Sequence, residues 1–214
     1  PGAEENVLED IHFTARPGET TAIIGSTGSG KSTLVNLIPR FYDVTEGAIT
    51  LDGTDIREIT QHDLRDKLGY VPQKGVLFSG TVASNILFGN PDGTEEEMTE
   101  AAEIAQAAEF IDEKPNKYNS RISQGGANVS GGQKQRLSIA RAIAKHPKVF
   151  IFDDSFSALD FKTDVTLRRA LKEKTADSTV IIVAQRISTI LHADQILVLD
   201  DGKIAGIGTH EELL

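Results

Sequence analysis

The chain has 214 residues, which is enough for one large α/β domain with room for a smaller subdomain. Its formal net charge of −10 argues against a nucleic-acid-binding surface, because phosphate backbones are bound by concentrated basic patches. The absence of cysteine excludes disulfides and thiolate metal sites, and no apolar run is long enough to span a bilayer.

The first part of the chain alternates between short apolar runs and helical patterns, which is typical of a mainly parallel sheet. Residues 7–13 predict a strand, and residues 20–24 predict a second, more apolar one. A helix is expected over residues 32–38, and further strands are expected over residues 47–51 and 68–71.

Between the second strand and the first helix, residues 25–32 fit the phosphate-loop pattern G-x-x-x-x-G-K-[ST]. Glycines let backbone N–H groups approach phosphate oxygens closely, and the following helix adds positive potential there. Lys31 is expected to contact the β- and γ-phosphates, and the Ser32 hydroxyl to ligate Mg²⁺. A glycine-rich turn with a solvated lysine is the alternative, which the position between strand and helix disfavours. The predicted nucleotide-binding residues of this loop are Gly25, Ser26, Thr27, Gly28, Ser29, Gly30, Lys31, Ser32 and Thr33.

The middle of the chain, residues 81–144, has a mainly helical pattern, and residues 95–108 are rich in Ala and Glu. Strand character returns at residues 149–153, 179–184 and 195–200. The simplest interpretation is a nucleotide-binding core that is interrupted by a helical insertion.

A single carboxylate, Asp153, follows four apolar residues that predict a buried strand. Such an acid suits a role in holding Mg²⁺, usually through a bound water. An apolar strand followed by Asp is common by itself, so this interpretation depends on the phosphate loop elsewhere in the chain.

The end of the chain contains two turn signals. Asp201-Gly202 predicts a hairpin that leads into a strand at residues 203–207. Thr209 and Glu212 have capping-box spacing, so a helix is expected to begin there. We expect a single domain (residues 1–214) cut from a longer polypeptide, with a core over about residues 1–75 and 145–214 and a helical subdomain over about 76–144.

Residues 129–133 read Val-Ser-Gly-Gly-Gln and resemble the L-S-G-G-Q signature of ATP-binding-cassette (ABC) ATPases, with Val in place of Leu. Ser130 and Gln133 have capping-box spacing, which predicts a helix whose first N–H groups are exposed by two glycines. The resemblance implies that this signature contacts the γ-phosphate held by an opposite subunit, through Ser130, Gly131, Gly132 and Gln133.

The resemblance extends over essentially the whole chain. It implies a P-loop NTPase (RecA-like) core with a mainly parallel sheet, an antiparallel β part and an inserted α-helical subdomain. Gln73 matches the glutamine loop that touches Mg²⁺ and senses the transmembrane domain, and Asp160 matches a loop that crosses the dimer interface. Residues 80–89 look like a segment of exporter-type cassettes. The implied Mg²⁺ ligands are Ser32, Gln73 and Asp153.

Two positions depart from the family pattern, and both concern hydrolysis. Asp154 stands where the family has a Glu that orients or deprotonates the attacking water. Losing one methylene retracts the carboxylate by roughly 1 Å, a misplacement that can cost about 10²-fold in rate. Gln185 stands where the family has His, and it can donate a hydrogen bond but cannot carry a proton or a positive charge. The two expected catalytic residues are therefore both non-standard.

Two smaller departures concern binding and coupling. Residues 123–126 differ modestly from the usual loop before the signature, where an acid is common at the position of Gln124. No aromatic residue precedes Phe13, whereas the family stacks adenine on a ring just upstream of the first strand. We expect that ring to precede residue 1, and since stacking contributes about 1–3 kcal/mol, the chain should bind ATP more weakly than its parent.

These observations predict the ATP-binding domain of a heterodimeric ABC exporter, with ATP and Mg²⁺ in a degenerate site. Its expected partners are a second, non-identical nucleotide-binding domain and the transmembrane domains, without nucleic acid. The chain itself is expected to be soluble and to lie at the cytoplasmic face of the cell membrane. Three alternatives remain: a fully active homodimeric cassette, a non-transport ABC clamp protein, and a scaffold that hydrolyses at neither site.

Overall fold

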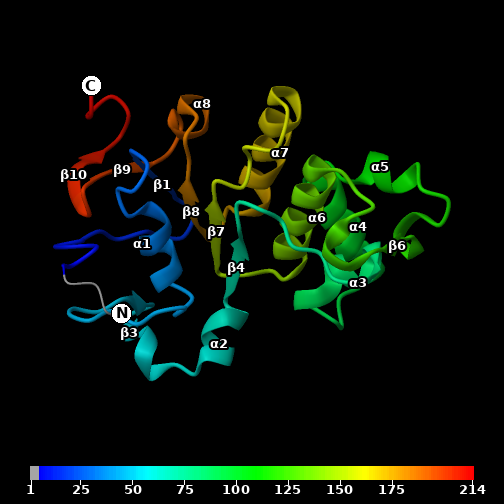
Figure 1. Cartoon of the computed structure of the whole chain (residues 1–214), viewed down its shortest axis with the longest axis horizontal. Coiled ribbons are helices and arrows are strands. Elements are labelled where there is room, and N and C mark those ends of the chain that lie inside the picture. Colours follow the sequence, from blue (N-terminus) through cyan, green and yellow to red (C-terminus); the bar gives the residue numbers. More distant parts are fainter. Residues whose placement is uncertain (1–4) are drawn as a thin grey trace.

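The computed structural model describes residues 5–214, and the first four residues of the predicted core lie outside that description. Its centre is a six-stranded sheet with the order β10-β9-β1-β8-β7-β4, in which only the β9–β10 pair is antiparallel (Figure 1). The prediction of a mainly parallel α/β sheet is confirmed. The strands are β1 (Thr20–Gly25), β4 (Leu68–Val71), β7 (Val149–Asp153), β8 (Thr179–Val183), β9 (Gln195–Asp200) and β10 (Lys203–Gly208).

Helices cover both faces of this sheet, which explains why its central strands are apolar almost without interruption (Figure 1). On one face lie α1 (Lys31–Leu37) and α2 (Gln61–Asp66), and their Leu34 and Leu64 belong to the same cluster as Ile151 and Ile181 of the sheet. On the other face, α6 (Gly131–Ala144) and α7 (Phe161–Lys174) share a second cluster with the neighbouring strand positions. Successive strand residues therefore pack alternately into two separate hydrophobic cores, one on each face of the sheet.

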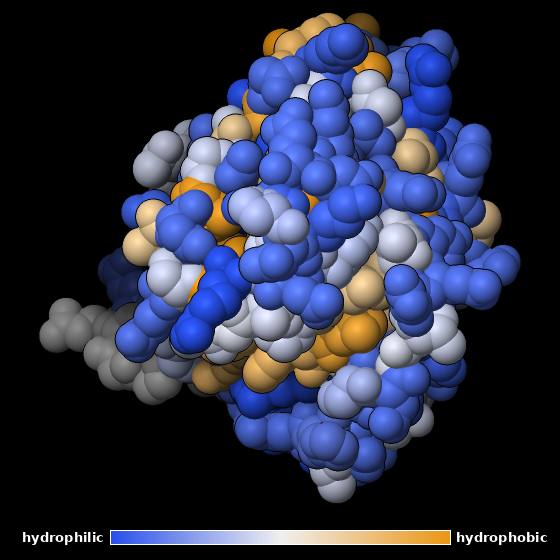
Figure 2. Space-filling model, turned by 90° about the vertical axis from the view of Figure 1, so that its right-hand side faces the viewer, coloured by the Kyte–Doolittle hydropathy of each residue, from blue (hydrophilic) through white to orange (hydrophobic). Residues whose placement is uncertain are grey.

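Three further helices gather around α6, at the right of Figure 1. They are α3 (Val82–Ile86), α4 (Glu95–Ile104) and α5 (Ala108–Asp112), and beside them β5 (Gly80–Thr81) pairs with β6 (Arg121–Ile122). The helical pattern predicted for this region is present, with one short strand pair added. Figure 2 shows this side of the molecule as mainly hydrophilic, with an apolar patch in its lower half.

Short elements complete the chain. The structure also contains β2 (Thr50–Leu51) and β3 (Thr54–Asp55), which pair with each other, and α8 (Ile187–Ile190). Four 3₁₀ turns lie at Ile56–Glu58, Leu87–Gly89, Lys117–Asn119 and Gln124–Gly126. None of the helices in the described part of the chain combines the length and apolarity that crossing a bilayer requires.

Four predicted elements differ from the structure, one of them being the helix expected from Thr209, where residues 210–213 form only a turn. Residues 7–13 do not form a strand: Asp10 has a φ of 51°, which breaks the extended backbone. The predicted strand 47–51 is reduced to β2. The helical pattern at residues 95–108 is divided between α4 and α5, because Gln106 adopts a φ of 57°.

The hairpin predicted at Asp201-Gly202 is confirmed by the antiparallel pairing of β9 with β10. Both residues have positive φ, 47° and 75°, as the tightest hairpin turns require. A Cβ at Gly202 would collide with the carbonyl oxygen of Val7, so glycine also admits the N-terminal segment here. Thr209 and Glu212 form the two reciprocal hydrogen bonds expected of a capping box, at 2.7 and 3.3 Å.

Candidate functional site

The site is positioned by the order of the strands. The consecutive neighbours β1, β8, β7 and β4 are parallel, so their carboxyl ends meet at one edge of the sheet. The phosphate loop follows β1, Gln185 follows β8, Asp153 ends β7 with Asp154 next to it, and Gln73 follows β4. Open parallel sheets bind ligands at this edge. The fold therefore brings together predicted residues that are up to 160 positions apart in the sequence.

The phosphate loop has the conformation that its glycines predict. Gly28 and Gly30 have φ values of 81° and 103°, and α1 begins immediately afterwards at Lys31. A Cβ at Gly25 would collide with the carbonyl oxygen of Leu199, so the loop can pass this point only as glycine. Lys31 Nζ donates to the carbonyl oxygens of Gly25 and Ser26 at 2.6 and 2.8 Å. The lysine thus lies across the inside of the loop, where its cation can meet phosphate oxygens.

A hollow of about 320 Å³ lies between the phosphate loop and the segment that follows β8. Such a volume is typical of small-molecule sites. Its polar wall includes Lys31 and Gln185, and its apolar wall includes Ile187 and Ile190 of α8. Gly25, Ser26 and Thr27 border it on the phosphate-loop side. A ligand with both a charged and an apolar part would match this lining.

Asp153 lies at the start of a chain of polar contacts behind the phosphate loop. Burial raises the pKa of its carboxyl, while a hydrogen bond with Tyr70 and a side-chain hydrogen bond with Ser32 counteract the shift. The Tyr70 hydroxyl is 3.1 Å from Asn36 Oδ1 and 3.4 Å from Asp153 Oδ2, and its single hydrogen serves one of them at a time. A carboxylate beside a serine hydroxyl supplies the oxygen donors that Mg²⁺ prefers.

Asp154 is the next residue, and its backbone is strained, with a φ of 49°. Its amide donates to the Val183 carbonyl at 2.9 Å, which joins the turn to β8. Gln73 Nε2 donates to Asp154 Oδ2 at 3.0 Å, so the two predicted residues are in direct contact. Burial, followed by the neighbouring Asp153 charge, raises the pKa of Asp154. The Gln73 carbonyl oxygen is not used in this contact and remains suited to Mg²⁺.

The donor set fits a magnesium ion held jointly by protein, water and phosphates. Within residues 5–214 no group of three His, Cys, Asp or Glu side chains is arranged as a complete metal site. Mg²⁺ usually binds through one or two protein oxygen ligands together with waters and substrate phosphates, so such a cluster is not required. Ser32, Gln73 and Asp153 would supply the protein part.

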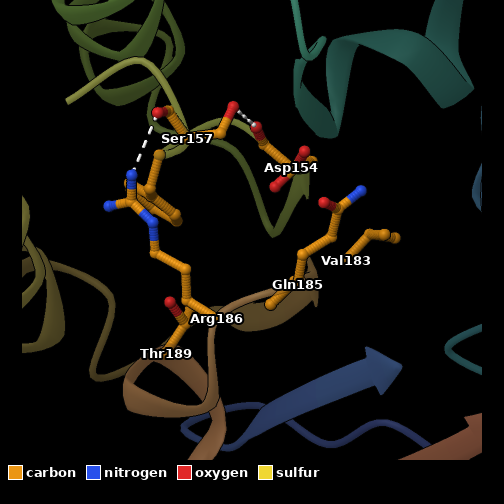
Figure 3. A pocket seen from close by; sticks show the side chains of 8 residues that line it. Asp154, Ser157, Val183, Gln185, Arg186 and Thr189 are labelled. Atoms are coloured by element: carbon orange, nitrogen blue, oxygen red, sulfur yellow. Dashed lines mark hydrogen bonds between the residues drawn. The ribbon is translucent and has the colours of Figure 1, made fainter. Parts of the chain in front are cut away.

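A smaller hollow connects Asp154 with the segment after β8 (Figure 3). Figure 3 shows Gln185 directed toward Asp154, whereas the adjacent Arg186 reaches the loop that contains Ser157. Arg186 Nη2 donates to the Ser157 carbonyl at 3.1 Å, and Ser157 Oγ donates to the Asp154 carbonyl at 3.0 Å. Asp154 and Gln185, both predicted as non-standard catalytic residues, therefore border one space.

The predicted signature forms a separate part of the surface. Ser130 is the N-cap of α6: its Oγ accepts from the Gln133 amide at 3.1 Å, and Gln133 Oε1 accepts from the Ser130 amide at 3.2 Å. This capping box is the one that the spacing predicts. A Cβ at Gly131 would meet no atom within 4 Å, so this end of α6 is open. Across the described residues, no hydrogen bond links Ser130, Gly131, Gly132 or Gln133 to the phosphate loop.

Asp160 caps α7 rather than projecting freely. Its Oδ1 accepts from the Thr163 amide at 3.0 Å and its Oδ2 from the Thr163 hydroxyl at 2.7 Å. The Thr163 side chain is the main reason that the pKa of Asp160 is lowered. The carboxylate therefore stabilises the start of α7 and holds the preceding loop in place.

Gln135 is a residue near the site that was not predicted. Gln135 is 1% exposed, and it accepts from the Gly75 amide at 2.9 Å and donates to the Pro72 carbonyl at 3.0 Å. It thereby holds the backbone on both sides of Gln73. The spacing of Gln135 could have indicated its burial. It lies three positions before Ser138 and four before Ile139, and both are buried on the inner face of α6.

Comparisons with known proteins agree with this geometry. The family model described as ABC transporter matches residues 8–157. A Mycobacterium tuberculosis protein, named as an uncharacterised ABC transporter ATP-binding protein, is 54% identical over 100% of this chain and 37% of its own length. A Bacillus subtilis protein, provisionally named as a multidrug export ATP-binding/permease protein, is 48% identical over 99% of this chain and 36% of its own length.

A solved structure of a bacterial Atm1-family ABC exporter with ATP bound matches with a TM-score of 0.94 and 40% sequence identity. The match covers 99% of this chain and 37% of that one. The chain thus spans little more than a third of the proteins to which it is similar.

Proposed function

The chain belongs to the ABC transporter family as an exporter-type nucleotide-binding domain, and from this premise we propose that it forms the slowly hydrolysing half of a heterodimeric exporter. Membership in this family implies binding of ATP, commonly with Mg²⁺, and ATP hydrolysis. In the proposal, Lys31 and the phosphate-loop amides hold the triphosphate. Ser32, Gln73 and Asp153 hold the Mg²⁺, which neutralises charge on the phosphates when it is bound.

The observation that carries the proposal is the environment of Asp154. Its side chain is one methylene shorter than a glutamate, and it is bound by Gln73 at 3.0 Å on a turn with a φ of 49°. That turn is itself joined to β8 through the bond from the Asp154 amide to the Val183 carbonyl. Because two contacts hold this position, the backbone cannot easily advance to compensate for the missing reach. Gln185 borders the same space, and its amide neither accepts nor releases a proton near neutral pH.

The signature at the start of α6 has a different role in the proposal. Its capping box and the open position of Gly131 support binding of an anion held by another subunit. We assign Ser130, Gly131, Gly132 and Gln133 to the site of a non-identical partner domain, where full hydrolysis takes place. Closing the two domains around ATP would then drive transmembrane domains between inward- and outward-open states, at the cytoplasmic face of the membrane.

The test is the rate of ATP turnover by the isolated chain with Mg²⁺. Wild type is compared with the double variant Asp154→Glu plus Gln185→His and with each single variant. Because the double variant restores both reach and proton transfer, we expect turnover about 10²-fold above wild type. ATP affinity, measured by equilibrium titration, should stay within about twofold, since the phosphate loop is unchanged.

The same assay examines the main competing function, a fully active homodimeric cassette. Brisk turnover by the unmodified chain, with no gain from the double variant, would favour that function and contradict the degenerate site.

A further inference from the structure

A buried carboxylate without an assigned role lies in the first turn of α7. The Asp164 side chain is 0% exposed, and its Oδ1 accepts from Arg168 Nε at 2.7 Å. Its Oδ2 accepts no hydrogen bond among the described residues, but lies 3.6 Å from Arg186 Nη1. A buried charge is tolerated only with opposite charges nearby, so both guanidinium groups are needed to hold it.

The Arg186 guanidinium makes two further contacts, and both are to the loop between β7 and α7. Its Nη2 donates to the Ser157 carbonyl at 3.1 Å and its Nη1 to the Leu159 carbonyl at 3.3 Å. A planar guanidinium can serve these carbonyls and a carboxylate together, which a lysine ammonium on a flexible stem cannot reproduce. Arg186 therefore connects α7, the loop and the segment after β8.

The three connected segments all border the site. Ser157 bonds back to the Asp154 carbonyl at 3.0 Å, and Gln185 precedes Arg186 in the sequence. Figure 3 shows the consequence: Arg186 reaches Ser157, and Gln185 is left directed toward Asp154. Arg168, the other partner of Asp164, donates from Nη1 to the Ser188 carbonyl at 3.0 Å. Through Arg168, the Asp164 carboxylate therefore also anchors the start of α8.

We propose that Asp164 is a positioning residue: by holding Arg186, it fixes the backbone that carries Gln185 against the loop that follows Asp154. This inference rests on the proposed function, because that function gives Asp154 and Gln185 their roles. A carboxylate that only interacted favourably with the α7 dipole would not need Arg186, because the dipole stabilises a negative charge anywhere in the first turn.

The first test is hydrogen exchange followed by mass spectrometry on the chain without nucleotide. Two amides report on the connected segments: that of Leu159, which donates to the Phe156 carbonyl, and that of Thr189, which donates to the Arg186 carbonyl. Asp164→Asn should speed exchange of both by about fivefold or more, with the central strands unchanged. Arg186→Lys, which keeps Asp164 intact, should speed exchange at Leu159 in the same way.

The matched control is Glu100→Gln, which removes the 2.8 Å ion pair between Glu100 and Lys174 near the other end of α7. It should leave exchange at both reporter amides unaltered. The proposal is overturned if Asp164→Asn leaves these amides unchanged, or if it speeds exchange equally through β7 and β8. If Asp164→Asn fails to fold, unchanged Leu159 exchange in Arg186→Lys would overturn it just as well.

The second test measures turnover in the Asp154→Glu plus Gln185→His background. Adding Asp164→Asn should lower kcat about tenfold while leaving KM for ATP within about twofold, because orientation is lost and phosphate binding is not. A rise in KM with kcat intact would contradict the positioning role. If the background itself shows no gain in turnover, the proposed function fails, and the exchange result still decides the role of Asp164.

Discussion

The two acids at the end of β7 lie next to each other but have different neighbours. Asp153 contacts Tyr70 and Ser32, whereas Asp154 contacts Gln73. Burial raises the pKa of both carboxyl groups. In the proposed function, a cation near Asp153 would offset the free-energy cost of burying its charged carboxylate. The Asp154 carboxylate keeps this cost, which lowers the stability of the isolated chain.

That cost should make the stability of the chain depend on pH. Because the folded-state pKa of Asp154 is raised above 3.8, folding favours its protonated form. Its contribution to stability is full below the ordinary pKa and is lost as the pH rises through the folded pKa. Asp154→Asn should therefore raise the melting temperature, by a larger margin at about pH 7 than at about pH 4, close to the ordinary pKa of the group. A margin that is constant or grows toward acid would contradict this, as measured by thermal unfolding without nucleotide or Mg²⁺.

A second prediction at this scale concerns Lys31. Removing its cation takes away charge-assisted bonds to the phosphates, each of which contributes about 1.5–3 kcal/mol. Lys31→Ala should therefore weaken ATP binding by roughly 10- to 100-fold, as measured by calorimetric titration. The matched control is Lys148→Ala, which removes an exposed lysine that pairs with Asp52 at 3.8 Å and should leave ATP affinity unchanged.

At the scale of single residues, the sequence was informative where a local pattern carries the chemistry. The phosphate loop is contiguous, and its position between β1 and α1 could be predicted. Gln135 and Arg186 could not be assigned in this way. Their contacts join residues 60 and 63 positions apart for Gln135, and 27 and 29 positions apart for Arg186. No local pattern contains such pairs.

Among the elements, α6 has the clearest start signal. The spacing of Ser130 and Gln133 predicts a capping box, and both reciprocal bonds are present. The cap satisfies two backbone N–H groups that the first turn of the helix would otherwise leave without a partner. The same bonds fix the orientation of the first turn of α6, which begins with the open Gly131.

The strength of this cap can be measured. Ser130→Ala should lower the free energy of unfolding by about 1 kcal/mol, because the Gln133 amide loses its acceptor. Ser130→Thr keeps a hydroxyl at the cap and should lose only a small part of that stability. Urea unfolding provides the comparison. Equal losses in the two variants would mean that the side-chain cap does not stabilise α6.

Elements that depend on a single backbone angle were harder to predict. Residues 7–13 have an apolar pattern, and Leu8, Ile11 and Phe13 do pack against the core, but the turn at Asp10 prevents a strand. Gln106 similarly separates α4 from α5 within a sequence rich in helix formers. In both places a non-glycine residue adopts positive φ, which composition does not reveal.

In the whole molecule, α6 is buried between the sheet and the helices around it. Its Leu137 is 0% exposed and belongs to the cluster that includes Phe150 and Ile182 of the sheet. The sequence predicted a mainly parallel sheet, and this is confirmed, with helices covering both of its faces. The division into a core and a helical subdomain remains a proposal.

Loss of packing at this position should affect the entire domain. Leu137→Ala should lower the free energy of unfolding by about 2–5 kcal/mol, through lost burial and the cavity that remains. Leu137→Met conserves volume and should cost less than about 1.5 kcal/mol. Denaturant unfolding monitored by circular dichroism measures both. A loss as large for methionine as for alanine would indicate that shape rather than volume decides at this position.

All the predicted nucleotide-binding loops leave the sheet at one edge, and this has a practical consequence for spectroscopy. The exposed turn that contains Asp177 lies before β8, at the opposite edge. Because the chain has no cysteine, Asp177→Cys would introduce a single thiol that can be attached to a fluorophore. The fluorescence anisotropy of a dye at that turn would report rotation of the domain, and the dye would not touch bound nucleotide. The same dye could then report domain rotation in each of the substituted chains proposed above.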